Sequence, residues 1–192
     1  MNIILLGGPG SGKGTLASGL TGYNVISTGD LIRSIRNDID NPLSKMVSSI
    51  IDQGNLLPDS LTNDIIANHL SKFKVGNKLD PRQQFMFDGY PRTTVQAKHL
   101  DAMCNIDLCV YLEVSTETCI NRLLERGKTS GRADDSNEDI IKNRLKIYYE
   151  QTVDLIKYYR LSKRLLVING EQSADDVKKS LLNNLRKIEY NA

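Results

Sequence analysis

The sequence predicts an α/β fold in three layers, with a five-stranded parallel sheet between two layers of helices. Short apolar runs alternate along the chain with longer segments of helical period, which is typical of parallel strands joined by crossover helices. The first apolar run leads directly into a glycine-rich turn, and a length of 192 residues suits one compact domain.

The expected strands are short and largely apolar. They are residues 2–6, 24–27, 84–87, 108–113 and 164–168. The fourth mixes Leu, Cys, Val and Tyr without polar alternation, as expected for a strand buried on both faces. Helical segments are expected after Lys13 and from Leu31, Thr62, Thr93, Thr116, Glu138 and Ala174. The helix after Lys13 should be short, because Gly19 and Gly22 each weaken a helix interior by about 1 kcal/mol relative to Ala.

Two segments fit poorly as plain crossover helices. Residues 28–57 are interrupted by Asn41-Pro42 and Gln53-Gly54, and residues 127–137 are polar and rich in turn formers. We interpret both as mobile excursions over the edge of a site, although either could be an ordinary surface loop. The core of the single domain is then expected to comprise residues 1–27, 58–126 and 138–192.

Composition limits the possible partners and compartments. Twenty-five basic against 23 acidic residues give a net charge of +2, which argues against broad nucleic-acid binding. The first apolar run is too short for a signal peptide, and no run approaches the roughly 20 residues of a membrane helix. The 3 cysteines show neither disulfide nor metal-pair spacing. We therefore expect a protein of the cytoplasm, or of a reducing organelle matrix, without membrane contact. We expect a monomer, because no feature marks an interface.

The glycine-rich turn has the composition of a phosphate-binding loop (P-loop). Gly7, Gly12 and Lys13 fit the spacing G-x-x-x-x-G-K between a strand and a helix. Glycines let consecutive N–H groups surround phosphate oxygens, and the following helix adds its positive end. The expected ATP-binding residues of the loop are Gly8, Pro9, Gly10, Ser11, Gly12, Lys13, Gly14 and Thr15. Gly14 stands where the general motif has Ser or Thr, so the usual hydroxyl contact to Mg²⁺ is missing at that position. Either Thr15 supplies the hydroxyl, or water molecules hold most of the ion.

Arginines at the ends of expected elements could gather around phosphates, because guanidinium stays charged and binds oxygen pairs as a fork. The candidates are Arg33, Arg92, Arg122, Arg126, Arg132 and Arg144. Solvated surface charges are expected at Arg36, Arg82, Arg160 and Arg186, and structural roles at His69, His99 and the tyrosine pairs 148–149 and 158–159.

Motifs along nearly the whole chain resemble the adenylate kinase family of nucleoside monophosphate kinases. Beside the P-loop they are Ser27-Thr28-Gly29-Asp30-Leu31-Ile32-Arg33, Phe87-Asp88-Gly89-Tyr90-Pro91-Arg92 with Gln96, Arg122 to Gly127, Thr129 to Asp135, and Arg144 to Tyr148. The resemblance implies Mg²⁺-dependent phosphoryl transfer from ATP to AMP, giving two ADP. No general base is then required, because the AMP phosphate is already ionised near neutral pH. The two excursions would close over AMP (28–57) and ATP (127–137) and exclude water.

The resemblance also assigns roles to single residues. The implied AMP-binding residues are Thr28, Arg33, Gly89, Arg92, Gln96, Arg132 and Arg144, with Gln96 reading the adenine edge. Arg122 would stack on the ATP adenine, and Arg126 would join the ATP site. The catalytic set would be Lys13, Asp88, Arg92, Arg126, Arg132 and Arg144. Asp88 would orient Mg²⁺ and its waters, with Thr15 as a further oxygen, and Asp134 and Asp135 would pair with lid arginines. The short lid lacks cysteines, so no structural zinc is expected.

Some readings stay open. Thr28 could only cap a helix, Asp88 could be a turn residue, and Gln96 could face solvent. A UMP/CMP kinase shares the implied fold, although Thr28 and Gln96 favour adenine. A catalytically inactive nucleotide-binding regulator should have lost one of the catalytic residues, and none is lost. A P-loop protein that remodels nucleic acid is disfavoured by the charge balance.

Overall fold

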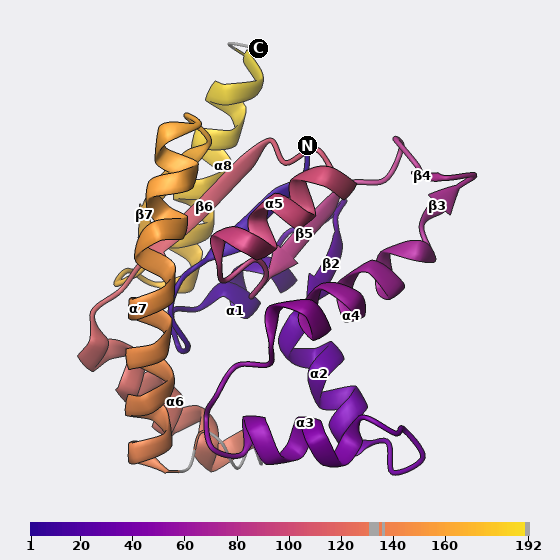
Figure 1. Cartoon of the computed structure of the whole chain (residues 1–192). Helices are drawn as coiled ribbons and strands as arrows, with labels where there is room; N and C mark the ends of the chain where they lie inside the picture. Colours follow the sequence, from indigo (N-terminus) through magenta and orange to yellow (C-terminus); the bar gives the residue numbers. More distant parts are fainter. Residues whose placement is uncertain (131–134, 136, 191–192) are drawn as a thin grey trace.

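A computed structural model describes residues 1–130, 135 and 137–190. Within these residues the main sheet is five-stranded and parallel, as predicted, with the strand order β2-β5-β1-β6-β7 (Figure 1). Its strands are β1 (Ile3–Leu6), β2 (Asn24–Ser27), β5 (Phe85–Asp88), β6 (Leu108–Glu113) and β7 (Leu165–Asn169).

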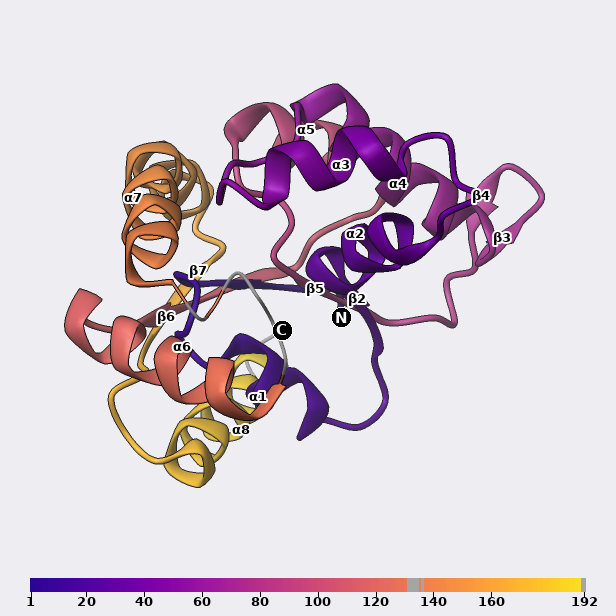
Figure 2. The ribbon, with the colours of Figure 1, turned by 90° about the horizontal axis from the view of Figure 1, so that it is seen from below.

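Helices cover both faces of this sheet (Figure 2). They are α1 (Lys13–Ser18), α2 (Thr28–Asn37), α3 (Ser44–Ile51), α4 (Asp59–Ser71), α5 (Thr94–Met103), α6 (Thr116–Ser130), α7 (Glu138–Leu161) and α8 (Ala174–Tyr190). One core layer joins the sheet to α4, α5 and α7, and the other joins it to α1 and α8. None of the described helices is long and apolar enough to cross a membrane.

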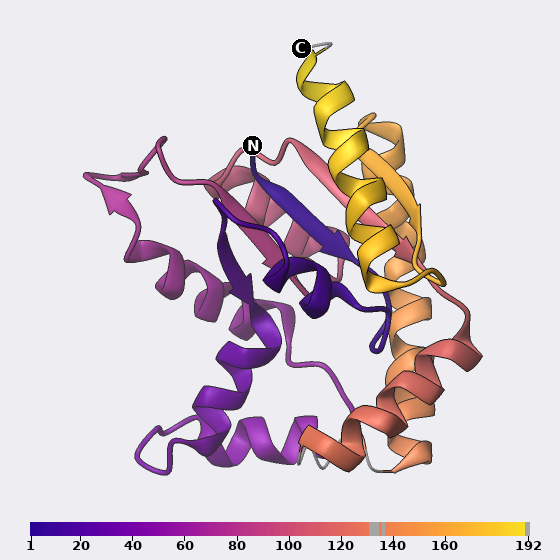
Figure 3. The same ribbon diagram turned by 180° about the vertical axis from the view of Figure 1, so that it is seen from behind.

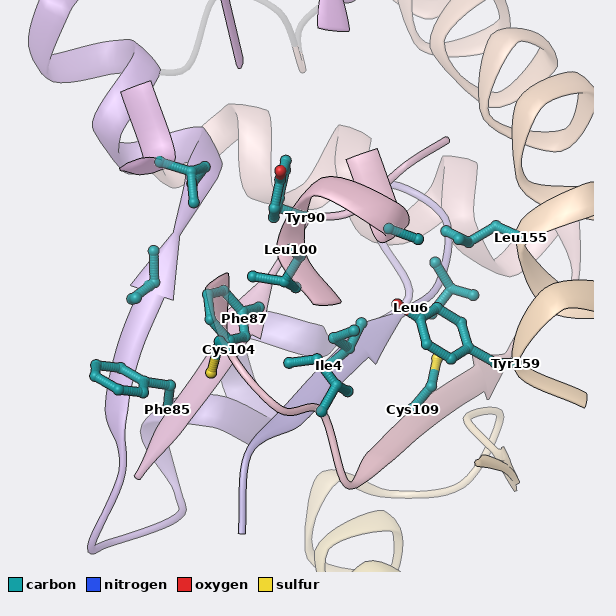
Figure 4. Packing of buried hydrophobic residues seen from close by; sticks show 14 of the residues in the cluster. Ile4, Leu6, Phe85, Phe87, Tyr90, Leu100, Cys104, Cys109, Leu155 and Tyr159 are labelled. Atoms are coloured by element: carbon teal, nitrogen blue, oxygen red, sulfur yellow. The ribbon is translucent and has the colours of Figure 1, made fainter. Parts of the chain in front are cut away.

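The three central strands, β1, β5 and β6, are largely buried on both faces, so their apolar residues divide between the two layers. In β1, Ile4 and Leu6 point into the layer of α5 and α7, where Figure 4 shows them beside Leu100, Leu155 and Tyr159. Their neighbours in β1 point into the layer of α1 and α8 instead. This division follows from the two-residue period of a strand, and it explains the continuous apolar runs in the sequence.

Helix α1 is short, as the sequence predicts, and Gly19 forms its C-cap. A Cβ atom at Gly19 would lie 3.4 Å from Cδ of Lys178 in α8. Figure 3 shows α1 and α8 together on one side of the sheet. The glycine that ends α1 therefore also leaves room for the side chain of the neighbouring helix.

Several element boundaries differ from the sequence prediction. Helix α2 begins at Thr28 rather than Leu31, because Ser27 is its N-cap and accepts a 3.3 Å hydrogen bond from the Asp30 N–H. Helix α4 begins directly after Pro58, three residues before the expected Thr62. Residues 28–57 are largely helical: α2 and α3 pack together with α4 around Val47.

Two features near the lid and the α4–β5 connection were also not predicted. Helix α6 continues to Ser130, so the first residues of the expected lid are helical. A hairpin of β3 (Lys74–Val75) and β4 (Lys78–Leu79) precedes β5. Its turn contains Gly76 at a φ of 63°, and the strands are too short to give a two-residue period that sequence analysis could detect.

Candidate active site

A cleft of about 630 Å³ lies beyond the carboxyl ends of β1, β2 and β5. Open parallel sheets usually bind ligands at this edge. The cleft brings together most of the site residues expected from the sequence. These are Pro9, Gly10, Gly12, Lys13, Gly14, Thr15, Thr28, Arg33, Asp88, Gly89, Arg92, Gln96, Arg122, Arg126 and Arg144.

The P-loop joins β1 to α1 and packs closely against α6. Gly10 and Gly12 have φ angles of 83° and 95°, which favour glycine. A Cβ atom at Gly10 would lie 2.5 Å from the carbonyl oxygen of Cys119 in α6, whereas one at Gly12 would meet no protein atom within 4 Å. Gly10 is therefore required by protein packing, while Gly12 leaves space on the cleft side of the loop.

Lys13 reaches back across the loop that it follows. Its Nζ atom donates hydrogen bonds to the carbonyl oxygens of Gly7 and Gly8 at 2.6 and 2.9 Å, and to Ser11 Oγ at 3.3 Å. Burial lowers the pKa of Lys13 to about 8, and the nearby charge of Asp88 opposes that shift. The ammonium thus sits inside the loop, among carbonyls that stabilise its charge.

Asp88 is the last residue of β5, which lies between β1 and β2. Its register partners are Leu5 on one side and Ser27 on the other. The carboxylate oxygen Oδ2 would lie 3.7 Å from a Cβ atom at Gly14, and Thr15 lines the same cleft. A carboxylate and a hydroxyl are hard oxygen donors of the kind that Mg²⁺ prefers, so these residues fit that ion.

Arg92 follows β5 and lines the cleft together with Thr28 and Arg33 of α2; we call this part of the cleft its α2 half. Its Nε atom donates a 2.9 Å hydrogen bond to the carbonyl oxygen of Gly89. Burial lowers the pKa of Arg92, and the neighbouring charges of Arg144 and Arg33 lower it further, while Asp88 acts in the opposite sense. Arginines from α2 and α7 are thus close enough to Arg92 to repel it, as expected in a cleft built for anions.

Thr28 and Gln96 are buried side chains at the wall of this half. Thr28 is only 1% exposed, its hydroxyl has no hydrogen-bond partner among the described residues, and Ser27 rather than Thr28 caps α2. The amide of Gln96, which is 2% exposed, accepts from the backbone N–H of Arg92 at 2.7 Å. The interpretation of Gln96 as a solvent-facing residue is therefore wrong.

Arg126 and Arg144, two of the arginines expected around the lid, bind the carboxylate of Asp135. Asp135 is fully buried and accepts from Arg126 Nε at 2.6 Å and from Arg144 Nη1 at 2.8 Å. Burial would raise the pKa of Asp135, but the hydrogen bonds and charges of the two arginines outweigh it and hold that pKa below its usual value. Arg132 and Asp134 lie outside the described residues.

Arg122 borders a second, smaller hollow of about 270 Å³ beside the P-loop. Its Nη2 atom donates a 3.0 Å hydrogen bond to the carbonyl oxygen of Gly170, which follows β7. Gln172 and Ser173 also line this hollow, and sequence analysis missed all three residues after β7. Their position at the carboxyl end of a parallel strand was the signal that could have found them.

Arg36 is not the solvated surface charge that the sequence suggested. It lines the main cleft and forms a 2.6 Å ion pair with Asp52, at the end of α3, with 29% of its side chain exposed. It follows Arg33 by three residues, a spacing that places both on one helix face. Arg82 is 83% exposed in its side chain, as expected, although it too forms an ion pair, at 2.8 Å with Asp80.

A structural metal site would require a cluster of His, Cys, Asp or Glu side chains. Among the described residues, no group of at least three His, Cys, Asp or Glu side chains could hold a metal ion. The expectation that the chain needs no structural zinc stays a prediction.

Comparison with known proteins agrees with this geometry. The family model "Adenylate kinase" matches residues 5–164. The chain is 38% identical to an adenylate kinase of Flavobacterium psychrophilum over 96% of its own length and 100% of that relative. It is 41% identical to an adenylate kinase of Bacteroides thetaiotaomicron (92% and 94% coverage) and 34% identical to one of Thermosipho melanesiensis (97% and 100%). The chain belongs to the adenylate kinase family and is a nucleoside monophosphate kinase, a phosphotransferase.

Proposed function

We propose that this cleft transfers the terminal phosphoryl group of Mg²⁺-bound ATP to AMP and forms two ADP. The observation that carries the proposal is the convergence of cations from separate elements on one cleft. The cleft is lined by Lys13 at the start of α1, Arg122 and Arg126 of α6, Arg33 of α2, Arg92 after β5 and Arg144 of α7. Two nucleotides bring many negative charges together, and phosphoryl transfer depends mainly on positioning and charge stabilisation.

The P-loop half of the cleft would bind ATP. The N–H groups of residues 8–15 and the start of α1 would hold the phosphates, and Lys13 would exchange its loop carbonyls for phosphate oxygens. Arg122 lies between the loop and the hollow after β7, where its planar guanidinium could stack on the adenine. Asp88 and Thr15 would hold Mg²⁺, which neutralises charge on the phosphates when bound.

The α2 half of the cleft would bind AMP. Arg33 and Arg92 would bind the phosphate, because each guanidinium can donate two parallel hydrogen bonds to its oxygens. The phosphate charge would also relieve the repulsion between the neighbouring arginines. Thr28 and Gln96 would face the base, since each is buried at the cleft wall with hydrogen-bonding capacity left. Arg126, Arg132 and Arg144 would surround the phosphoryl group during transfer.

Closure of the two excursions would keep water away from the phosphoryl group. Support comes from a contact between the first excursion and α7, the helix that follows the second: Asn143 Nδ2 in α7 donates a 3.1 Å hydrogen bond to the carbonyl oxygen of Gln53. Gly54 lies against Ile140 and Arg144 in the same helix. We propose that residues 28–57 close over AMP and residues 127–137 over ATP.

We also propose that the enzyme is monomeric and cytoplasmic, and that it acts on free nucleotides and not on nucleic acid. The free, buried cysteines and a net charge of +2 support it.

The test is ADP formation from ATP and Mg²⁺ with AMP, CMP, UMP or no acceptor. We expect rapid turnover with AMP alone, and a loss of about 10³-fold or more in Arg92→Ala, by analogy with arginines that act on a transferring phosphoryl group. Arg160→Ala is the matched control, because Arg160 is exposed at the far end of α7. Strong turnover of CMP or UMP would contradict the proposed adenine site, and ATP binding without transfer to any acceptor would contradict the proposed reaction.

A further inference from the structure

The side chain of Gln96 is held at both ends of its amide. Its Oε1 atom accepts from the Arg92 N–H at 2.7 Å, and its Nε2 atom donates to Asp59 Oδ1 at 2.7 Å. The other carboxylate oxygen of Asp59 accepts from Thr93 Oγ1 at 2.8 Å. Asp59 is the first residue of α4, and Thr93 is the N-cap of α5, so this network ties two helices to one amide.

These partners leave only one orientation for the amide. A backbone N–H can only donate, and an ionised carboxylate can only accept. Turning the amide of Gln96 by 180° would place two donors together at Arg92 and two acceptors together at Asp59. Both mismatches would lie beside a 2% exposed side chain, where unpaired polar groups are costly.

We infer that Asp59 is a positioning residue, which fixes the Gln96 amide so that the site selects adenine over purines of reversed hydrogen-bond order. The inference rests on the proposed role of Gln96 in binding the acceptor base. One N–H and one lone pair of the amide remain for a ligand. In adenine, an acceptor (N1) stands beside a donor (the 6-amino group), whereas hypoxanthine offers a donor (N1–H) beside an acceptor (O6).

If the Gln96 amide could turn, it could form two hydrogen bonds to either adenine or hypoxanthine. A fixed amide pairs with adenine and meets hypoxanthine donor to donor and acceptor to acceptor. Sites built to pair with one hydrogen-bond pattern reject the wrong one because buried groups are left without partners. Asp59 would thus act on specificity without touching the nucleotide.

The test compares AMP with inosine 5′-monophosphate (IMP) as acceptors in wild type and Asp59→Asn. Asparagine keeps the shape of Asp59 but can donate or accept, so it removes the mismatch that a turned Gln96 amide would meet at residue 59. Only the mismatch at the Arg92 N–H then opposes the turned orientation. Thr93 can likewise donate to it or accept from it. We expect the ratio of kcat/KM for IMP to that for AMP to rise about tenfold, mainly through KM. Asp64→Asn, the same change at an exposed site on the same helix, should leave the ratio unchanged.

CMP provides an internal control, because cytosine also places an acceptor beside an amino group. Its kcat/KM relative to AMP should not change in Asp59→Asn, whereas a general loosening of the pocket would raise it. Melting temperatures of all variants separate specificity from stability. If Asp59→Asn melts below the assay temperature, Asp59→Ser is measured in its place.

A lowered melting temperature with an unchanged IMP to AMP ratio would overturn the inference and leave Asp59 as a link between α4 and α5 only. A parallel rise for IMP and CMP would overturn it as well. Failure of the wild type to phosphorylate AMP would instead contradict the proposed function. The wild-type reaction with AMP therefore distinguishes failure of the inference about Asp59 from failure of the proposed function.

Discussion

Replacing the P-loop glycines one at a time should separate their packing role from their role in nucleotide binding. Gly10 and Gly12 both have positive φ, so an alanine at either position is strained by about 1–2 kcal/mol. Only at Gly10 does the new methyl group also collide with protein, 2.5 Å from the carbonyl oxygen of Cys119 and 3.0 Å from Leu123 Cγ. Overpacking of this kind costs about a further 1–3 kcal/mol.

The two variants should therefore fail in different ways. At about 2–4 °C per kcal/mol for a chain of this size, Gly12→Ala should lower Tm by about 2–8 °C and Gly10→Ala by about 4–20 °C. The methyl group of Gly12→Ala meets no protein atom within 4 Å and points into the space proposed for phosphates. A clash with ATP of about 1–3 kcal/mol would then raise KM for ATP by about 5- to 150-fold.

The assay is a thermal melt of nucleotide-free protein, together with KM for ATP at saturating AMP. Gly76→Ala is the matched control for strain alone, because Gly76 has a φ of 63° and nothing within 4 Å in the β3–β4 hairpin. It should lose stability to the same degree as Gly12→Ala and keep its KM for ATP. Equal melting temperatures for Gly10→Ala and Gly12→Ala would refute the argument from the Cys119 contact.

Further predictions concern stability, pH and closure. Asp101 accepts a two-bond fork from Arg164 at 3.0 and 3.1 Å, so Asp101→Ala should cost about 2 kcal/mol and lower Tm by about 4–8 °C, with kcat unchanged in the AMP assay. Burial lowers the pKa of Lys13 from 10.5 to about 8, so between these pH values the unfolded chain binds a proton that the folded chain has released. The free energy of unfolding of the nucleotide-free protein, measured by urea titration, should therefore rise with pH over this range relative to that of Lys13→Met. If the free energy of unfolding of the wild type instead falls relative to that of Lys13→Met, the burial of Lys13 is contradicted. Asn143→Ala removes the 3.1 Å hydrogen bond to the carbonyl oxygen of Gln53 and should raise KM for AMP by about 2- to 12-fold without changing Tm; an unchanged KM would show that this contact does not support closure.

The P-loop half of the cleft was predictable because its signals are local. Gly12 and Lys13 lie beside each other in the sequence, directly after an apolar strand, and Asp88 ends another such strand. Parallel strands bring their carboxyl ends to one edge, so residues that follow strands must meet there. The order of the strands was not needed to predict that these residues converge.

The α2 half of the cleft contains contacts that no local pattern shows. Asp59 and Gln96 are separated by 37 residues and belong to different helices. In the sequence Asp59 is an acidic residue in the first turn of a helix, which the helix dipole alone would explain. The sequence likewise predicts a surface charge at Arg36, because it does not show that the end of α3 brings Asp52 beside it. Partners of this kind depend on how helices pack, and periodicity does not determine packing.

The order of the strands explains why Asp88 lies beside both the P-loop half and the α2 half of the cleft. Strand β5 lies between β1, which leads into the P-loop, and β2, which leads into α2 and the proposed acceptor site. The end of β5 is therefore the position in the sheet that adjoins both connections, and Asp88 lies beside Leu5 and Ser27 in the register. A slip of β5 by one residue would turn Asp88 to the other face of the sheet and bring Phe87 out of the layer that contains Leu100. The packing of Phe85 and Phe87 against α4 and α5 thus also fixes the direction of the carboxylate, so core substitutions in β5 should impair phosphoryl transfer as well as stability.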